Sequence, residues 1–198
     1  MKQNNIAFFD FDGTITIDDT LLKFIRFVVG DKKFLVGLFI LSPILILYKI
    51  KIIPNYKAKQ YMLSWYFKGM QKEEFFKVSY EYSMNYIDSI VRQKAKERLL
   101  WHKNQGDKIV VVSASIDCWI RPWCEKNGLE LIATKLDIKN NKITGNLLTK
   151  NCYGQEKVNR IKNQYNLNDY NHIYAYGDSR GDKEMLALAN FSFFKPFR

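Results

Sequence analysis

Short apolar runs of strand length, rich in β-forming side chains, recur along the chain. They lie at residues 6–9, 108–113, 131–134, 172–176 and 191–194. Between the later runs the apolar residues follow the three-to-four-residue spacing of amphipathic helices, at residues 117–127, 156–165 and 183–189. Alternation of strand and helix predicts an α/β fold with a Rossmann-like, doubly wound parallel sheet.

A long helical segment separates the first strand from the second. Its pattern predicts helices at residues 18–30, 54–67, 72–87 and 88–104, each ended by a glycine or a change of pattern. About ninety residues lie between the two strands, whereas one crossover unit needs only ~30. We therefore predict a core of residues 1–17 and 88–198, and an all-helical cap of residues 18–87 inserted above the end of the first strand. Residues 136–147, which alternate around Asn140-Asn141, predict a β-hairpin.

One apolar stretch in the predicted cap raises the question of whether the protein is purely soluble or also contacts a membrane. Residues 34–48 carry no charge, are interrupted by Ser42-Pro43, and are followed by a segment with two lysines. A membrane-spanning helix needs ~20 apolar residues, so this run is too short and too broken to span a bilayer. The pattern favours either a buried helix pair or a hairpin in a membrane interface.

Composition and charge restrict the class of protein. The 198 residues are 47% hydrophobic and 26% charged, which is typical of a globular chain. A net charge of +11 favours anionic partners, namely phosphate esters, anionic lipid or nucleic acid. The three cysteines form no Cys-x-x-Cys pair, and no secretory signal precedes the first strand. We therefore expect reduced thiols and a cytoplasmic location.

Two carboxylates follow the first strand directly. Alternate side chains of a strand share one face, so Asp10 and Asp12 can point into one crevice, and Gly13 lets the backbone turn sharply after them. Paired carboxylates repel each other unless a cation lies between them. The stretch predicts a divalent-cation and phosphate site at the carboxyl end of the strand, where open α/β sheets bind ligands. The alternative is an ordinary surface turn.

Three further segments follow the same logic. Ser113 ends an aliphatic strand and precedes Ala114, Lys157 lies near the start of a helix, and Asp178 and Asp182 follow another apolar strand. Together with Asp10 and Asp12 they supply carboxylates for Mg²⁺, a hydroxyl and an ammonium for phosphate oxygens, and a nucleophile. This combination decides against the surface turn.

In this order the four segments resemble the motifs of the haloacid dehalogenase superfamily, and the early insert resembles the type-one (C1) cap of its phosphoserine-phosphatase-like subfamily. The resemblance implies that Asp10 is the nucleophile, forming an aspartyl phosphate, and that Asp12 is the general acid and base. It implies that Asp10, Asp178 and the backbone carbonyl of Asp12 bind Mg²⁺, with Asp182 holding a metal-bound water or orienting its neighbours.

The same resemblance assigns the phosphate-binding residues. Ser113, with Ala114 beside it, and Lys157 would bind the oxygens of the transferring phosphoryl group. Charge spread over these oxygens has to be neutralised during phosphoryl transfer, which agrees with the residue types present.

The substrate stays open at this point. Asp19, the apolar cap and residues 152–158 resemble the phosphatidylglycerophosphatase C branch, which implies a phosphatidylglycerophosphate-like lipid. The apolar run and the many lysines of the cap favour peripheral contact with an anionic membrane at its inner face. The alternatives are phosphoserine or another small soluble ester, with the apolar run as the cap's own core. A different class would be a non-enzymatic module for anionic membranes or nucleic acid. Paired carboxylates hinder simple anion binding, and no nucleic-acid-binding motif is present, so we expect no nucleic-acid partner.

Overall fold

Five parallel strands form one sheet, as the sequence predicts, in the order β3-β2-β1-β6-β7. The computed structural model describes residues 4–198. Met1–Gln3, which belong to the segment where we expect no secretory signal, lie outside the described residues. The first strand is central, and its Phe9 lies opposite Val111 on one side and Tyr176 on the other. The strands are β1 (Ile6–Phe9), β2 (Lys108–Ile116), β3 (Glu130–Thr134), β6 (Ile173–Gly177) and β7 (Phe191–Phe194).

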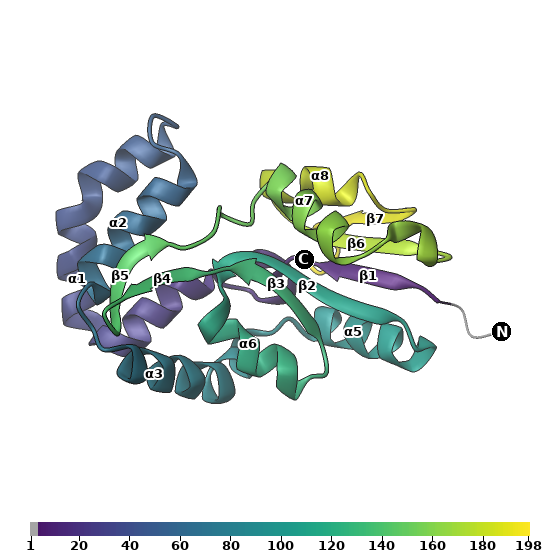
Figure 1. The fold of residues 1–198 in the computed structure, drawn as a ribbon, viewed down its shortest axis with the longest axis horizontal. Coiled ribbons are helices and arrows are strands. Elements are labelled where there is room, and N and C mark those ends of the chain that lie inside the picture. Colours follow the sequence, from purple (N-terminus) through teal and green to yellow (C-terminus); the bar gives the residue numbers. More distant parts are fainter. Residues whose placement is uncertain (1–3) are drawn as a thin grey trace.

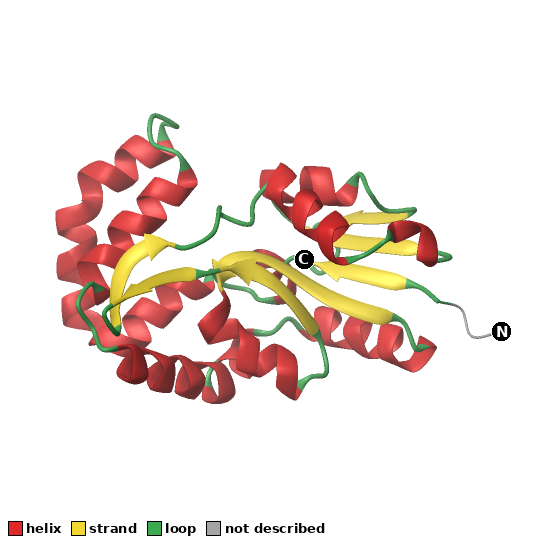
Figure 2. Cartoon of the chain, viewed as in Figure 1, coloured by secondary structure: helices red, strands yellow, loops and turns green. Residues whose placement is uncertain are grey.

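Helices cover both faces of this sheet (Figures 1 and 2). All four residues of β1 are buried, because a central parallel strand has helices on each side. Ile6 and Phe8 contribute to the hydrophobic cluster beneath α7 and α8, whereas Ala7 and Phe9 join the larger cluster on the other face. The flanking helices are α5 (Gln93–Gln105), α6 (Asp117–Lys126), α7 (Gln155–Gln164) and α8 (Lys183–Leu186).

Three helices form a separate helical lobe at one end of the sheet, on the left of Figure 1. They are α1 (Thr20–Lys49), α2 (Asn55–Phe67) and α3 (Lys72–Asn85), and a short α4 (Ile87–Ile90) leads back toward the core. The expected break at Gly30 is present: its φ of 75° and ψ of 167° are non-helical, and the helix resumes directly after it.

Neither a helix pair nor a hairpin is found at residues 34–48, so that expectation was wrong. The run forms one continuous helical segment, the part of α1 that follows Gly30, and Pro43 lies inside it. A proline has no N–H for the carbonyl four residues earlier. Here the Ser42 hydroxyl donates to that carbonyl, on Phe39, at 2.7 Å, so the helix continues across the proline.

The predicted hairpin is present as β4 (Leu136–Lys139) and β5 (Lys142–Leu147), and both turn asparagines have positive φ. It packs against the helical lobe rather than against the sheet. The Gly69 N–H donates to the Ile143 carbonyl, and the Ile143 N–H donates to the Met70 carbonyl, both at 2.9 Å. Residues from outside 18–87 therefore contribute to the lobe.

The two chain segments that join the lobe to the core run side by side. The Ile17 N–H donates to the Ile90 carbonyl, and the Arg92 N–H donates to the Ile15 carbonyl, each at 2.8 Å. Because Val91 takes part in this antiparallel contact, residues 91 and 92 are not helical. The helix predicted at residues 88–104 therefore begins only at Gln93, as α5.

Candidate active site

The turn after β1 brings the first carboxylate to the edge of the sheet. The Asp10 N–H still donates to the Tyr176 carbonyl, at 2.9 Å, and the chain turns away after it through Gly13, whose φ is 77°. A Cβ at Gly13 would lie 2.6 Å from an Asp178 carboxylate oxygen, so only glycine allows this approach. The Thr14 hydroxyl lies 3.2 Å from Asp10 Oδ2 and 3.3 Å from Asp178 Oδ1.

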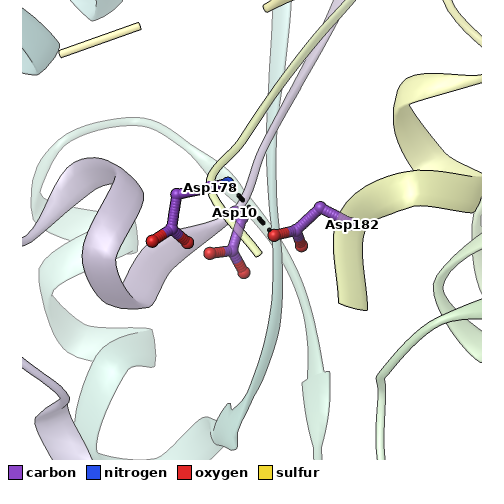
Figure 3. A group of neighbouring side chains, drawn as sticks. All are labelled: Asp10, Asp178 and Asp182. Carbon is purple, nitrogen blue, oxygen red and sulfur yellow. Dashed lines mark hydrogen bonds between the residues drawn. The ribbon is translucent and has the colours of Figure 1, made fainter. Parts of the chain in front are cut away.

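Three carboxylates gather at this edge, as Figure 3 shows. Asp10, Asp178 and Asp182 each place an oxygen within 4.8 Å of the others. The short helical turn after β6 returns Asp182 toward the strand end, where its Oδ2 accepts hydrogen bonds from the Ser179 N–H at 2.9 Å and hydroxyl at 2.8 Å. Such a group of hard oxygen donors suits a divalent cation such as Mg²⁺.

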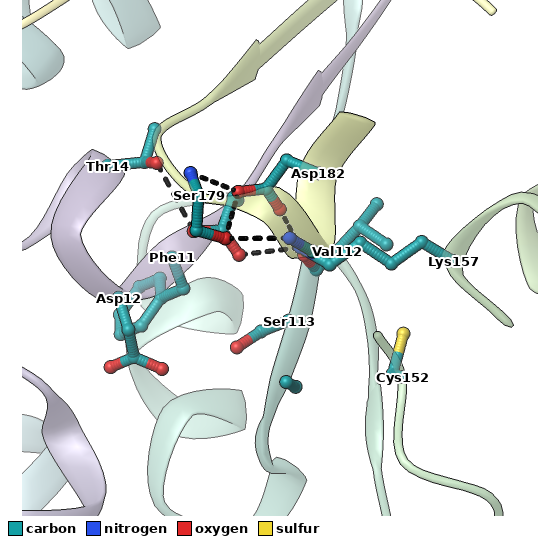
Figure 4. A network of polar contacts seen from close by, with 12 residues as sticks. Phe11, Asp12, Thr14, Val112, Ser113, Cys152, Lys157, Ser179 and Asp182 are labelled. Atoms are coloured by element: carbon teal, nitrogen blue, oxygen red, sulfur yellow. Dashed lines mark hydrogen bonds and ion pairs between the residues drawn. The ribbon is translucent and has the colours of Figure 1, made fainter. Parts of the chain in front are cut away.

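The Asp12 side chain lies outside this group and points away from it (Figure 4). Its Oδ1 accepts from the Thr20 N–H at 2.7 Å, and its Oδ2 accepts from the Ser115 hydroxyl at 2.5 Å. The fold therefore keeps the Asp12 carboxylate apart from that of Asp10, so an ion held by Asp10 would have only the backbone of Asp12 available.

Lys157 connects two of the gathered carboxylates from inside the protein. Its ammonium donates to Asp10 Oδ1 and Asp182 Oδ1, both at 2.6 Å, and to the Val112 carbonyl at 2.7 Å. Burial disfavours a charged lysine, but the two carboxylates outweigh it and raise the pKa of Lys157. Burial also raises the pKa of Asp10 to about 7, against the opposing pull of Lys157.

The segment at the end of β2 lies beside these groups (Figure 4). Ser113 is fully buried, and its hydroxyl oxygen accepts from the Ser115 N–H at 3.0 Å. The pairing of β2 with β3 shifts register between Ser113 and Ile116, which takes Ala114 out of the regular ladder. Its carbonyl instead accepts from the Lys59 ammonium at 2.5 Å and the Thr134 hydroxyl at 2.9 Å.

Of the residues nominated from the sequence, the structure groups Asp10, Asp178, Asp182 and Lys157, with Ser113 and Ala114 at the neighbouring end of β2, whereas the Asp12 side chain points away from the group. Several neighbours of the site were missed. Ser115 could have been found, because it shares a strand face with Ser113. Lys59 comes from the helical lobe, 55 residues away in sequence from Ala114, and no local pattern distinguishes it from Lys57, the other lysine of α2. Arg198, whose guanidinium pairs with Asp178, has no sequence signal either.

Comparisons with known proteins agree with this site and fold. The family model described as haloacid dehalogenase-like hydrolase matches residues 7–187. Protein CicA of Caulobacter vibrioides is 31% identical over 192 residues, which cover 96% of this chain and 85% of CicA.

Solved structures show the same fold. A protein of unknown function from Bordetella pertussis Tohama I matches with a TM-score of 0.82 and 21% identity, covering 94% of this chain and 87% of its own. A substrate-bound phosphoserine phosphatase matches with a TM-score of 0.65 and 21% identity, covering 98% and 87%. On the extent of the family match and the identity to CicA, the chain belongs to the haloacid dehalogenase-like hydrolase family.

Proposed function

We propose that the protein is a Mg²⁺-dependent phosphatase that hydrolyses phosphate monoesters through an aspartyl phosphate on Asp10. The observation that carries this proposal is the placement of Asp10 among Asp178, Asp182 and the buried Lys157. Lys157 engages one carboxylate oxygen of Asp10 and leaves the other facing Thr14. A carboxylate nucleophile held beside fixed positive charge is what phosphoryl transfer requires.

The proposed reaction has two steps, in which Asp10 and Asp12 have different roles. An Asp10 oxygen attacks phosphorus, the bond from phosphorus to the leaving oxygen breaks, and the carboxyl group of Asp12 gives its proton to the departing alcohol. Asp12 then takes a proton from a water molecule that attacks the phosphorus, and the bond to Asp10 breaks to release phosphate. Ser113, the backbone at Ala114 and Lys157 would hold the phosphoryl oxygens during both steps.

The oxygen donors fit the cofactor that the family typically uses. Asp10, Asp178 and the backbone carbonyl of Asp12 would hold Mg²⁺, with Asp182 oriented beside them by Ser179 and Lys157. The bound ion would neutralise charge on the phosphoryl oxygens.

Removal of the metal gives the first prediction and tests the function itself. The purified protein should hydrolyse 4-nitrophenyl phosphate with Mg²⁺, lose this activity in excess EDTA, and regain it when Mg²⁺ is restored in excess, because all candidate ligands are hard oxygens. Release of 4-nitrophenolate measures each state. Activity that persists when metal analysis finds none would remove the cation from the mechanism. No turnover under any condition would favour the non-enzymatic binding module.

The proposed substrate is a phosphatidylglycerophosphate-like lipid, with phosphoserine or another small ester as the alternative. Arg26 is the one arginine between residues 18 and 87, and it pairs with Asp31 at the exposed surface of α1. An amino-acid carboxylate would therefore find no arginine of that segment in the site. Initial rates on phosphatidylglycerophosphate in mixed micelles and on phosphoserine would decide between the two.

We also propose that residues 18–87 act as the cap and that its outer face contacts an anionic membrane. Leu35, Phe39 and Ile46 recur at helical spacing along α1, and Ile50, directly after its last residue, continues the same spacing, so the four form one apolar stripe. These side chains are exposed, Phe39 to 81% and Leu35 to 63%. Exposed lysines border the stripe at both ends: Lys32, Lys33, Lys49 and Lys51. Among the described residues, none of the helices is both long enough and apolar enough to cross a bilayer.

Binding to vesicles is the second prediction. Each lysine near an anionic bilayer contributes ~1 kcal/mol, and the apolar stripe adds to this. The protein should co-sediment with anionic but not neutral vesicles at low salt, and binding should weaken as salt rises. The variant with Lys32, Lys33, Lys49 and Lys51 changed to Gln should lose most of it. A wild-type protein that stays in the supernatant would exclude the contact and favour a soluble ester.

A further inference from the structure

A second buried lysine reaches the active site from the helical lobe. Lys59 of α2 is only 8% exposed and, with Lys157, is one of two buried lysines among residues 4–198. Its side chain crosses from the lobe to the core, where the ammonium donates to the Ala114 carbonyl at 2.5 Å and to the Asn151 side-chain oxygen at 2.9 Å. A buried charge is costly unless it is paired, so a lysine at this position is unfavourable unless its charge has a partner or a functional role.

The hydrogen-bond partners of Lys59 are both neutral, in contrast to those of Lys157. The carboxylates of Asp12 and Asp19 lie near enough to favour its charged form, although burial lowers the pKa of Lys59 to about 8. Neither carboxylate accepts a hydrogen bond from it: Asp12 accepts from Thr20 and Ser115, and Asp19 caps the start of α1. An ammonium has three N–H groups, and within the described part of the chain only two of those of Lys59 have acceptors.

The position of Lys59 is on the leaving-group side of the proposed reaction. Ala114 follows the phosphate-binding Ser113, and Asp12 would protonate the departing alcohol. One turn before Lys59 on α2, Asn55 accepts a hydrogen bond from Asn151 at 3.1 Å. Both asparagines line a cavity of about 640 Å³ between α2 and residues 147–156. An alcohol that departs from phosphorus and takes a proton from Asp12 would therefore lie close to Lys59, and Asn151, which accepts from Lys59, connects this position to the cavity.

We infer that Lys59 is a specificity-determining residue whose ammonium binds an anionic oxygen on the leaving group of the substrate. The inference rests on the proposed phosphatase function and names its substrate class: phosphate monoesters whose alcohol carries a second anionic group, such as a carboxylate or a phosphodiester. A neutral side chain could donate to the Ala114 and Asn151 oxygens equally well. The Lys59 ammonium, which is charged and has one unused N–H, instead favours substrates with an anionic group over neutral ones.

Two aryl phosphates that differ in one charge test this inference. The wild type should have a higher kcat/KM for 3-carboxyphenyl phosphate than for phenyl phosphate. Lys59→Met should lose at least about tenfold more activity on the carboxylated ester than on the neutral one, because a charge-assisted hydrogen bond is lost for that substrate alone. Lys59→Arg should restore part of the preference. Circular dichroism checks the fold of each variant. Lys57→Met, an exposed lysine on the same helix, is the control and should change neither rate.

The outcomes separate the alternatives. Equal losses on both esters would overturn the inference, since a lysine that only holds Ala114 or balances Asp12 and Asp19 acts on every substrate alike. A wild type without preference for the carboxylated ester would overturn it as well. A wild type that hydrolyses neither ester would instead refute the phosphatase function on which the inference rests.

Discussion

Replacing Asp10 with asparagine should lower the turnover rate by about four orders of magnitude or more, while the fold is preserved. The amide is a poor nucleophile, and it also removes a negative charge from the group that would hold the ion. The side chain of Asn has nearly the same shape, and Lys157 keeps the Asp182 carboxylate and the Val112 carbonyl as hydrogen-bond partners, so the fold should be preserved. Steady-state hydrolysis of 4-nitrophenyl phosphate measures the loss, and circular dichroism with thermal melting measures the fold.

Asp31→Asn is a matched control, because Asp31 is exposed on α1 and pairs only with Arg26 among the described residues. It should retain wild-type activity. If the folded Asp10→Asn variant kept the wild-type rate, Asp10 would not be the nucleophile, and the whole assignment of the site would fall with it.

Asp12→Asn should slow turnover by about two to four orders of magnitude for a different reason. Asparagine can still accept from the Thr20 N–H, so the turn after β1 should be preserved. It cannot deliver a proton to the leaving alcohol or take one from water. With 4-nitrophenyl phosphate the leaving group needs little help, so the first step should proceed and the second should stall.

A stalled second step leaves a measurable product. The variant should release a burst of 4-nitrophenolate of about one equivalent, and acid quenching should recover protein-bound phosphate. The double variant Asp10→Asn, Asp12→Asn should trap no phosphate, which locates the label on Asp10. Undiminished steady-state turnover of Asp12→Asn would contradict the acid and base role.

The sheet and the nominated site residues could be predicted because they depend on local pattern and on one topological rule. Asp10, Ser113 and Asp178 each follow an apolar run, and the carboxyl ends of parallel strands meet at one edge. Their convergence therefore required only that the strands be parallel. Lys157 belongs to the same argument because the helix that carries it packs directly on this sheet.

The contribution of the helical lobe could not be predicted in the same way. Hydrophobic pattern gives the apolar face of a helix but not what covers it, so residues 34–48 could have been a buried core or an exposed stripe. The serine that lets α1 continue across Pro43 acts through a side-chain hydrogen bond that no periodicity reports. Lys59 was missed because its contacts are set by how the lobe packs on the core.

The hairpin of β4 and β5 has a consequence for protein engineering. Ile143 forms two backbone hydrogen bonds with the lobe, and a Cβ on Gly145 would lie 2.3 Å from the Ser64 hydroxyl oxygen. A chimera that exchanges residues 18–87 for the equivalent part of a relative would leave this hairpin facing a foreign surface. Transplantation of substrate preference between homologues should therefore move residues 136–147 together with the insert, as one cassette encoded in two separate stretches of the gene.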